Sequence, residues 1–212
     1  LMNSFYGVFA SGFYRFTHKD LGSSITAWAR HNIKAIIQKL DEEGHHVVYS
    51  DTDSIFVRSP VAEGSPSVLR EDADQETIDA YEAAKQAMID FGLEVAQRYS
   101  KDSAVLEYEK GLSVFFSHGA KKRYVGQVVY PTEEMLIRGY ETQRTDSFEY
   151  LTTAMKQMFQ FALNDERDAL IQHALETVSA VKKHEVPARR LILAKSCKGR
   201  VDSNGGVDFT KD

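Results

Sequence analysis

The sequence predicts an α+β fold, in which helices pack on one face of an antiparallel sheet. Residues 21–43 and 75–99 carry apolar side chains at helical spacing. Strand-forming residues around a polar turn predict a hairpin over residues 46–57, between these two helices. Further strand-like stretches follow the second helix, which completes the mixed pattern of an α+β domain.

The amino-terminal elements are defined by glycines and by apolar spacing. Residues 1–12 are predicted to hold the end of a helix and a turn, because Gly7 and Gly12 interrupt them. Gly44 lies where the helix of residues 21–43 should be capped. The apolar side of that helix consists of Ile25, Trp28, Ala29, Ile33, Ile36, Ile37 and Leu40.

The carboxy-terminal elements follow a surface loop that is marked by two prolines, Pro60 and Pro66. After the helix of residues 75–99, we expect strands at 104–109, 112–117, 123–130 and 134–138. We then expect helices at 147–163 and 166–182, and a turn or mobile loop after Lys198.

Composition limits the class of protein. The chain has 212 residues, of which 42% are hydrophobic and 27% charged, as in an ordinary globular domain. No apolar run approaches the ~18 residues of a membrane span, so we expect no membrane partner. The single cysteine, Cys197, excludes an internal disulfide.

Charge is unevenly distributed around a net value of −5. Residues 61–110 hold 12 acidic and 5 basic side chains, and a solvated face accounts for them. Residues 182–200 hold 7 basic side chains and 1 acidic one. Phosphate binding follows local basic surface rather than total charge. The basic stretch is therefore interpreted as a contact to the DNA backbone, with a solvated face as the alternative.

The hexapeptide from Tyr49 to Ser54 places two carboxylates, Asp51 and Asp53, inside a strand–turn–strand segment. Aspartate is depleted in strands, and such a local violation is typical of functional sites. Residues i and i+2 of an extended backbone face the same way, so the two carboxylates could share a cation. On this pattern alone, a polar hairpin turn remains the alternative.

Five segments resemble the family B DNA polymerases, in the order and at the approximate spacings of that family. The hexapeptide is similar to the family's third polymerase motif, Tyr-Gly-Asp-Thr-Asp-Ser. The other segments are Asn3–Gly7 (second motif, on a fingers helix), Ser24–Arg30 (palm helix), Lys121–Tyr124 (primer–template element) and Arg138–Asp146 (palm–thumb boundary). The archaeal members look nearest.

The resemblance implies a domain organisation. Residues 1–12 would be the end of a fingers helix and a turn, and residues 13–146 the palm with its antiparallel sheet. Residues 147–212 would be the palm–thumb transition and a truncated, partly helical thumb.

The same resemblance implies template-directed transfer of dNMP from dNTP to a primer 3′ end, with two Mg²⁺ ions that Mn²⁺ can replace. Asp53 is the first choice for the ligand bridging both ions, and Asp51 is a supporting carboxylate. Glu107 and Glu109 alternate in a predicted strand, and Glu109 is favoured as the further metal ligand. A solvent-facing carboxylate pair is equally consistent with the alternation.

Substrate contacts are also implied. Asn3, Tyr6 and Gly7 would bind the nucleotide, with the Tyr6 ring against the nascent base pair. Lys121, Lys122, Arg123 and Tyr124 would grip the DNA backbone without reading sequence, and Lys122 and Tyr124 would lie near the primer end. Arg144 would reach a phosphate, or else pair with Asp146 or Glu141.

The first polymerase motif, which supplies another essential aspartate, is absent from these 212 residues. We therefore expect the chain to be inactive alone, and to be either a fragment or a subunit of a split polymerase. The beginning at Leu1 rather than Met slightly favours the fragment. The partners implied are primer–template DNA, dNTP, the remainder of the polymerase (exonuclease, first motif and fingers) in cis or in trans, and a sliding clamp. The location implied is cytoplasmic and nucleoid-associated if the source is prokaryotic.

Three alternatives belong to other classes. One is a non-catalytic nucleic-acid-binding module that retains the palm fold, and retention of both aspartates argues against it. A second is a scaffolding subunit. A third is the palm of a different polymerising enzyme such as a reverse transcriptase, which the Thr between the aspartates makes a poor match.

Overall fold

The computed structural model describes residues 2–61, 64–101, 105–140, 142, 147–194, 200–201 and 207–208. For residues 2–5, 200–201 and 207–208 the description is limited to the backbone. The chain divides into two compact units. Unit 1 comprises Leu1–Ser65 and Gln86–Tyr108, and unit 2 comprises Pro66–Lys85 and Glu109–Asp212. The helix α3 (Gln75–Tyr99) contributes its first part to unit 2 and its remainder to unit 1.

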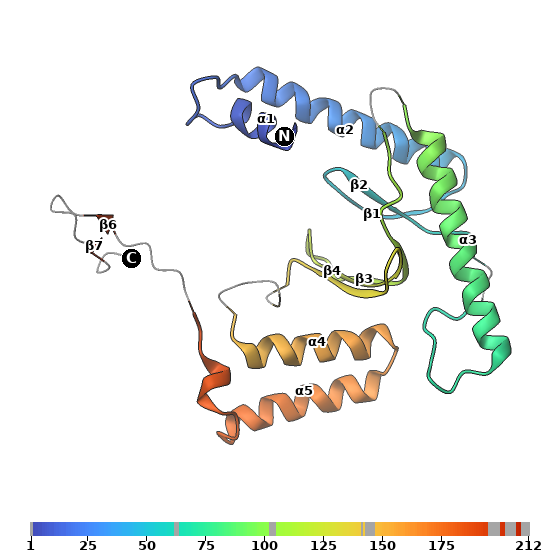
Figure 1. Cartoon of the computed structure of the whole chain (residues 1–212), viewed down its shortest axis with the longest axis vertical. Helices are drawn as coiled ribbons and strands as arrows, with labels where there is room; N and C mark the ends of the chain where they lie inside the picture. Colours follow the sequence, from blue (N-terminus) through green and yellow to red (C-terminus); the bar gives the residue numbers. More distant parts are fainter. Residues whose placement is uncertain are drawn as a thin grey trace. The chain divides into compact units, whose positions relative to one another are not determined.

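Unit 1 is built around one long helix. Its elements are α1 (Met2–Ala10), α2 (Lys19–Glu42), β1 (Val47–Asp51), β2 (Ser54–Val57) and the end of α3 (Figure 1). Helix α1 packs against α2, and the β1–β2 hairpin packs against α2 as well. Gly22 allows the first of these contacts, because a Cβ there would lie 3.3 Å from the Cα of Ala10.

Only part of the apolar side of α2 is covered within the described residues. Leu40, near the carboxy-terminal end, is 1% exposed, whereas Trp28, nearer the amino-terminal end, is 65% exposed. The helix ends as the sequence predicts, because Gly44 adopts a positive φ of 82°. The N–H of His45 then donates to the carbonyl of Leu40 at 2.8 Å, which satisfies one of the terminal carbonyls.

The end of α3 is tied to the end of α2 within unit 1. The Arg98 guanidinium pairs with the Glu43 carboxylate at 3.1 Å, and the His45 and Phe91 rings lie 5.1 Å apart. Tyr99 is buried beside this ion pair, and burial, followed by the negative charge of the nearby Glu43 carboxylate, raises the pKa of its hydroxyl. These contacts hold the carboxy-terminal part of α3 against the carboxy-terminal end of α2 within unit 1.

Unit 2 contains the three-stranded antiparallel sheet, in the order β3 (Gly111–Ser117), β4 (Tyr124–Tyr130) and β5 (Glu134–Arg138). Helix α4 (Glu149–Leu163) packs on β3 and β4, and α5 (Arg167–Lys182) packs on α4 (Figure 1). The remaining elements are the 3₁₀ helix η2 (Ala188–Leu191) and the paired short strands β6 (Arg200–Val201) and β7 (Val207–Asp208).

The core of unit 2 lies between the sheet and α4. Val125 of β4 and Ile137 of β5 are directly paired and nearly fully buried, and Leu163 of α4 completes the cluster. Phe159 packs at its edge, with its ring centroid 4.8 Å from that of Tyr140. Burial of these side chains against α4 is what holds the sheet and the helical layer together.

The first turn of α3 belongs to unit 2 and is capped by Asp74. The backbone N–H of Thr77 donates to Asp74 Oδ1 at 2.9 Å, as in a typical amino-terminal cap. Hydrogen bonds from the Thr77 side chain and backbone lower the pKa of the Asp74 carboxyl.

The α+β fold class predicted from the sequence is confirmed, as are the helices and the strands from residue 111 onward. The strand predicted over residues 104–109 is wrong for residues 105–109, which carry no strand, and Ala104 lies outside the described residues. The physical reason is local. The Ser100 hydroxyl accepts the N–H of Leu106 at 2.8 Å and also contacts its carbonyl, so these backbone groups bond a side chain instead of a neighbouring strand.

Two further sequence expectations concern the ends of the chain and the membrane. The turn expected after Lys198 falls mostly outside the described residues, apart from the strands β6 and β7. None of the helices that the structure describes combines the length and the apolar character needed to span a bilayer.

Candidate functional site

The two aspartates of the hexapeptide flank the tip of the β1–β2 hairpin in unit 1. Asp51 is the last residue of β1 and pairs with Ser54, the first residue of β2, which leaves Thr52 and Asp53 as the connecting turn. The N–H of Asp53 donates to the carbonyl of Asp51 at 2.6 Å. A hydrogen bond that spans two residues defines a γ-turn, so the chain reverses in the smallest possible space.

Thr52, between the two aspartates, is strained. Its φ is +47°, in the left-handed region that a β-branched residue rarely adopts. Such conformations cost about 1–3 kcal/mol each and persist where the surrounding structure imposes them, often at functional sites. The γ-turn imposes this conformation here, and the sequence gives no glycine to relieve it.

Side-chain hydrogen bonds hold one aspartate more firmly than the other. The Thr52 hydroxyl donates to Asp51 Oδ1 at 3.1 Å, and the Ser54 hydroxyl donates to the Asp51 carbonyl at 3.1 Å. Asp51 is half-buried, whereas Asp53 is exposed. The turn therefore holds Asp51 in place and presents the Asp53 carboxylate outward.

The donor chemistry of this turn fits a divalent cation. Two carboxylates one residue apart, on a rigid turn, offer only oxygen ligands, which Mg²⁺ prefers. Among the residues that the structure describes, no three His, Cys, Asp or Glu side chains gather into a metal-binding cluster. Glu109 is exposed and belongs to unit 2, so its predicted part in metal binding stays a prediction.

The predicted nucleotide-binding residues lie on α1, which packs against α2 in unit 1. Asn3, Tyr6 and Gly7 are three and four residues apart, so they share one side of the helix. Tyr6 is 42% exposed, and a Cβ added to Gly7 would meet no atom within 4 Å. The side chain of Asn3 lies outside the described residues, and all three roles stay predictions.

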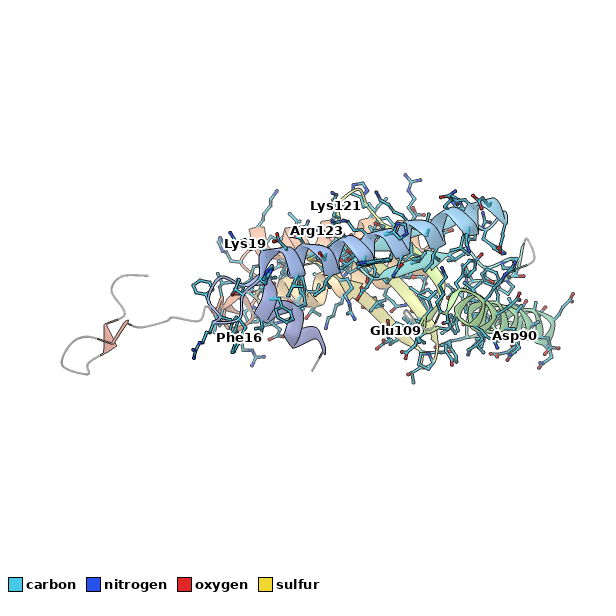
Figure 2. All side chains as sticks on the ribbon, turned by 90° about the horizontal axis from the view of Figure 1, so that it is seen from above. Phe16, Lys19, Asp90, Glu109, Lys121 and Arg123 are labelled. Atoms are coloured by element: carbon cyan, nitrogen blue, oxygen red, sulfur yellow. The ribbon has the colours of Figure 1, made fainter. Side chains whose placement is uncertain are left out.

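The predicted DNA-binding cations gather in unit 2, in the turn that joins β3 to β4, where Figure 2 labels Lys121 and Arg123. Lys121, Lys122 and Arg123 are exposed, and Tyr124 begins β4. The N–H of Arg123 donates to the carbonyl of Ala120 at 3.3 Å, which closes a β-turn. The turn thus presents three consecutive cationic side chains on its surface.

Strand pairing brings one more cation beside this turn. Arg138, the last residue of β5, pairs directly with Tyr124, and directly paired residues project to the same face. Arg138 belongs to the palm–thumb segment of the sequence, but its place beside the cationic turn depends on strand register, which is not visible in the local sequence. The Arg-Gly sequence at 138–139 was the only available signal.

The other predicted cations have mixed outcomes. Arg144, with its alternative partners Asp146 and Glu141, lies outside the described residues. In the basic stretch of residues 182–200, Arg190 is already engaged. Its Nε donates to Glu149 at 3.1 Å, and its guanidinium lies 5.3 Å from the centre of the Tyr150 ring.

That engagement gives Arg190 a structural role in joining η2 to α4, two elements that are in contact. Lys182, Lys183 and Arg189 are exposed, and they remain available as contacts to DNA phosphates.

Comparison with known proteins agrees with these sequence motifs. A family model described as DNA polymerase family B matches residues 1–204. The DNA polymerase of Thermococcus kodakarensis is 28% identical over 196 residues, which cover 90% of this chain and 10% of that protein. DNA polymerase II of Escherichia coli K12 is 29% identical over 201 residues, which cover 89% of this chain and 24% of that protein.

A solved structure gives the same result for the fold. The family B DNA polymerase of the hyperthermophilic archaeon Pyrobaculum calidifontis matches with a TM-score of 0.58 and 20% sequence identity. The match covers 96% of this chain and 23% of that one. The chain therefore spans about a quarter of the length of that protein, over nearly all of its own residues.

Proposed function

This chain belongs to DNA polymerase family B, and we propose that it carries an aspartate pair and a DNA-gripping turn of a DNA-directed DNA polymerase. That enzyme would add dNMP from dNTP to a primer 3′ end. Residues 1–12 would be the end of a fingers helix and a turn, residues 13–146 the palm, and residues 147–212 the palm–thumb transition and part of the thumb. The strained Asp51-Thr52-Asp53 turn is the observation that supports this proposal most.

Asp53 and Asp51 would hold the catalytic divalent cations, with Glu109 as a further carboxylate. Family B DNA polymerases generally use divalent metals, and we propose two Mg²⁺ ions here, which Mn²⁺ can replace. When bound, two such ions favour ionisation of the primer 3′ hydroxyl and neutralise charge on the leaving pyrophosphate. The exposed Asp53 carboxylate suits the bridging position, and the hydrogen bond from Thr52 orients the Asp51 carboxylate.

The turn geometry itself would contribute to catalysis by orientation. A γ-turn with a hydrogen bond of 2.6 Å leaves the two carboxylates little backbone freedom. Catalytic groups that are held in place need no reordering when substrate binds, which lowers the entropic part of the barrier. The backbone strain at Thr52 would then be the energetic consequence of holding the Asp51 and Asp53 carboxylates in a fixed arrangement before substrate binds.

The exposed ring of Tyr6 would lie against the nascent base pair, and Gly7 would let the substrate approach the backbone of α1. Asn3 would complete this nucleotide-binding side of the helix. An aromatic face and a bare backbone recognise shape rather than base identity, as template-directed synthesis requires.

The cationic turn would grip the primer–template duplex. Lys121, Lys122 and Arg123 would neutralise backbone phosphates, and Tyr124 would contact a sugar near the primer end. Such contacts position the duplex without carrying sequence information.

Exposed apolar side chains support the proposal of further polymerase segments as partners. On α2, Leu21, Ile25 and Trp28 lie on one side of the helix and are each at least 45% exposed. The exonuclease, the first motif and the fingers, in cis or in trans, would cover such a surface. A sliding clamp and, in a prokaryotic source, a nucleoid-associated cytoplasmic location belong to the same proposal.

We further propose that these 212 residues do not extend a primer alone, because the aspartate of the first polymerase motif is not among them. The test is primer extension with Mg²⁺ and four deoxynucleotides, using the chain alone and the chain mixed with a purified segment that carries the first motif. Extension is expected only in the mixture. Extension by the pure chain would overturn the proposal of inactivity.

Asp53→Asn in the mixture is expected to lower the extension rate at least a hundredfold, because a bridging carboxylate is lost. DNA binding should be unchanged. Asp90→Asn is the matched control, since Asp90 is an exposed aspartate of unit 1 that accepts a hydrogen bond from Gln86. If a folded mixture binds DNA but never extends the primer, a non-catalytic nucleic-acid-binding module becomes the better interpretation.

A further inference from the structure

The residue that follows β5, Gly139, packs directly on the backbone of the cationic turn. Gly139 has a positive φ of 72°. A Cβ at this position would lie 2.9 Å from the Lys122 carbonyl carbon and 3.0 Å from Arg123 Cγ, and closer still to the Lys122 carbonyl oxygen. Because the obstructing atoms include backbone, a side chain cannot be accommodated by a simple rotamer change. Only glycine fits this position without displacing the turn.

Lys122, on the other side of this contact, has an unusual conformation of its own. It has a φ of +64° and occupies the third position of the β-turn that the Ala120–Arg123 hydrogen bond closes. A positive φ at this position is typical of Gly or Asn, not of Lys. Something outside the turn must therefore favour this conformation.

Two neighbours supply that constraint. The Ser117 hydroxyl donates to the carbonyl of Arg123 at 3.2 Å, which fixes the end of the turn to β3. The pairing of Tyr124 with Arg138 brings Gly139 against the Lys122 peptide. The turn is thus held from β3 on one side and from the end of β5 on the other.

We propose that Gly139 is a positioning residue for DNA binding. Its bare backbone lets the Lys122 peptide settle in the left-handed conformation, and this conformation orients Lys121, Lys122 and Arg123 toward the duplex. The proposal rests on the proposed function, because it assumes that these three side chains contact phosphates. Gly139 itself touches no DNA and acts only through the turn.

The test is Gly139→Ala in the 212-residue chain, with binding to a fluorescein-labelled primer–template duplex followed by anisotropy over a series of salt concentrations. A displaced turn loses phosphate contacts, so the Kd is expected to rise about tenfold, and the salt dependence of binding should become shallower. A lower melting temperature with an unchanged slope against salt would indicate a general loss of packing and would overturn the positioning role.

Gly119→Ala is the matched control. Gly119 lies in the same β3–β4 connection and also has a positive φ, of 58°, but a Cβ there would meet no atom within 4 Å. The control therefore introduces left-handed strain without a collision. Its Kd is expected to change less than about twofold, the size of an ordinary surface effect.

A second comparison tests whether Gly139 acts through the turn. In a chain that already carries Lys121→Ala, Lys122→Ala and Arg123→Ala, the change Gly139→Ala should produce no further loss of affinity, because coupled residues are non-additive. An additive loss would overturn the proposal. If the triple variant binds DNA like the parent, the DNA contact itself is wrong. If the triple variant binds the duplex weakly but the Gly139→Ala variant binds it like the parent, only the positioning role is wrong.

The unmodified chain provides a measurement that does not depend on a variant folding. When the duplex is titrated into the ¹⁵N-labelled chain, the amide resonances of Lys122 and Gly139 should shift together. A Gly139 resonance that stays fixed while Lys122 shifts would contradict the proposal.

Discussion

Thr52 illustrates at the scale of one residue how a local backbone cost can serve the proposed chemistry. Its positive φ is forced by the γ-turn between Asp51 and Asp53, and its hydroxyl is bonded to the Asp51 carboxylate. Glycine would adopt this backbone freely but could not orient Asp51. The residue therefore combines a strained backbone with a useful side chain.

Two substitutions separate these effects. Thr52→Gly relieves about 1–2 kcal/mol of left-handed strain but adds about 0.4–1 kcal/mol of unfolded-state entropy. It also removes the hydroxyl bond to Asp51, which costs about 0.5–1.5 kcal/mol. The free energy of unfolding should therefore stay within about 1 kcal/mol of the parent. Thr52→Val keeps the strain and removes the hydrogen bond, which costs about 0.5–1.5 kcal/mol. Urea denaturation measures both, and a glycine variant less stable than the valine variant would show that Thr52 is not strained.

Helix α3 shows at the scale of one element how its beginning is stabilised by charge. Asp74 accepts hydrogen bonds from the side chain and backbone of Thr77, and they lower the pKa of its carboxyl from an ordinary value of 3.8. A carboxyl whose pKa is lowered on folding stabilises the folded state above its unfolded pKa. That contribution disappears as the pH falls through the folded pKa.

The pH dependence of the Asp74→Ala variant follows from this sign. At pH 7, Asp74→Ala should lower the urea midpoint, because the helix loses its cap. As the pH falls below 3.8 and through the lowered folded pKa, the parent carboxyl becomes protonated and loses its charge, so the gap between the two midpoints should narrow. Asp79→Ala, within the same helix, is the control, and it removes a carboxylate that accepts from Gln75. A gap that is constant from pH 7 to pH 2 would contradict a charged cap.

At the scale of the whole molecule, the net charge of −5 hides two separate basic surfaces in unit 2. One is the turn of Lys121, Lys122 and Arg123, and the other is the exposed set Lys182, Lys183 and Arg189. Arg190 is already occupied by Glu149 and Tyr150. A basic segment of sequence therefore divides into cations that hold the fold and cations that remain exposed.

Salt dependence should separate the two basic surfaces. If Lys121 contacts a phosphate, Lys121→Ala should reduce the slope of log K against log salt concentration by about 0.9. Lys183→Ala should do the same only if the second surface also binds the duplex. Lys34→Ala, on the exposed side of α2, should leave the slope unchanged. An unchanged slope for Lys121→Ala would remove the β3–β4 turn from the DNA interface.

Much of the secondary structure was predictable because its causes are local. Apolar spacing and Gly44 determine α2, and the alternation of strand formers around a polar turn determines the β1–β2 hairpin. The segment of residues 105–109 was mispredicted because strand-forming composition does not reveal that the Ser100 hydroxyl bonds the backbone of Leu106 within it. Asp51 and Asp53 were recognisable because aspartate is rare in strands. The cationic turn was recognisable as a run of consecutive basic residues, Lys121, Lys122 and Arg123.

Residue identity and spacing along the chain were enough to indicate the family, the α+β class and the residues that carry the proposed chemistry. Only the tertiary structure revealed the γ-turn that strains Thr52, the pairing of Arg190 with Glu149, and the contact of Gly139 with Lys122. The strain at Thr52 is a matter of backbone angles. The other two features join residues that are 17 and 41 positions apart in the chain, so they depend on how the elements pack. Local sequence encodes propensities, whereas register and backbone strain are decided when the elements pack.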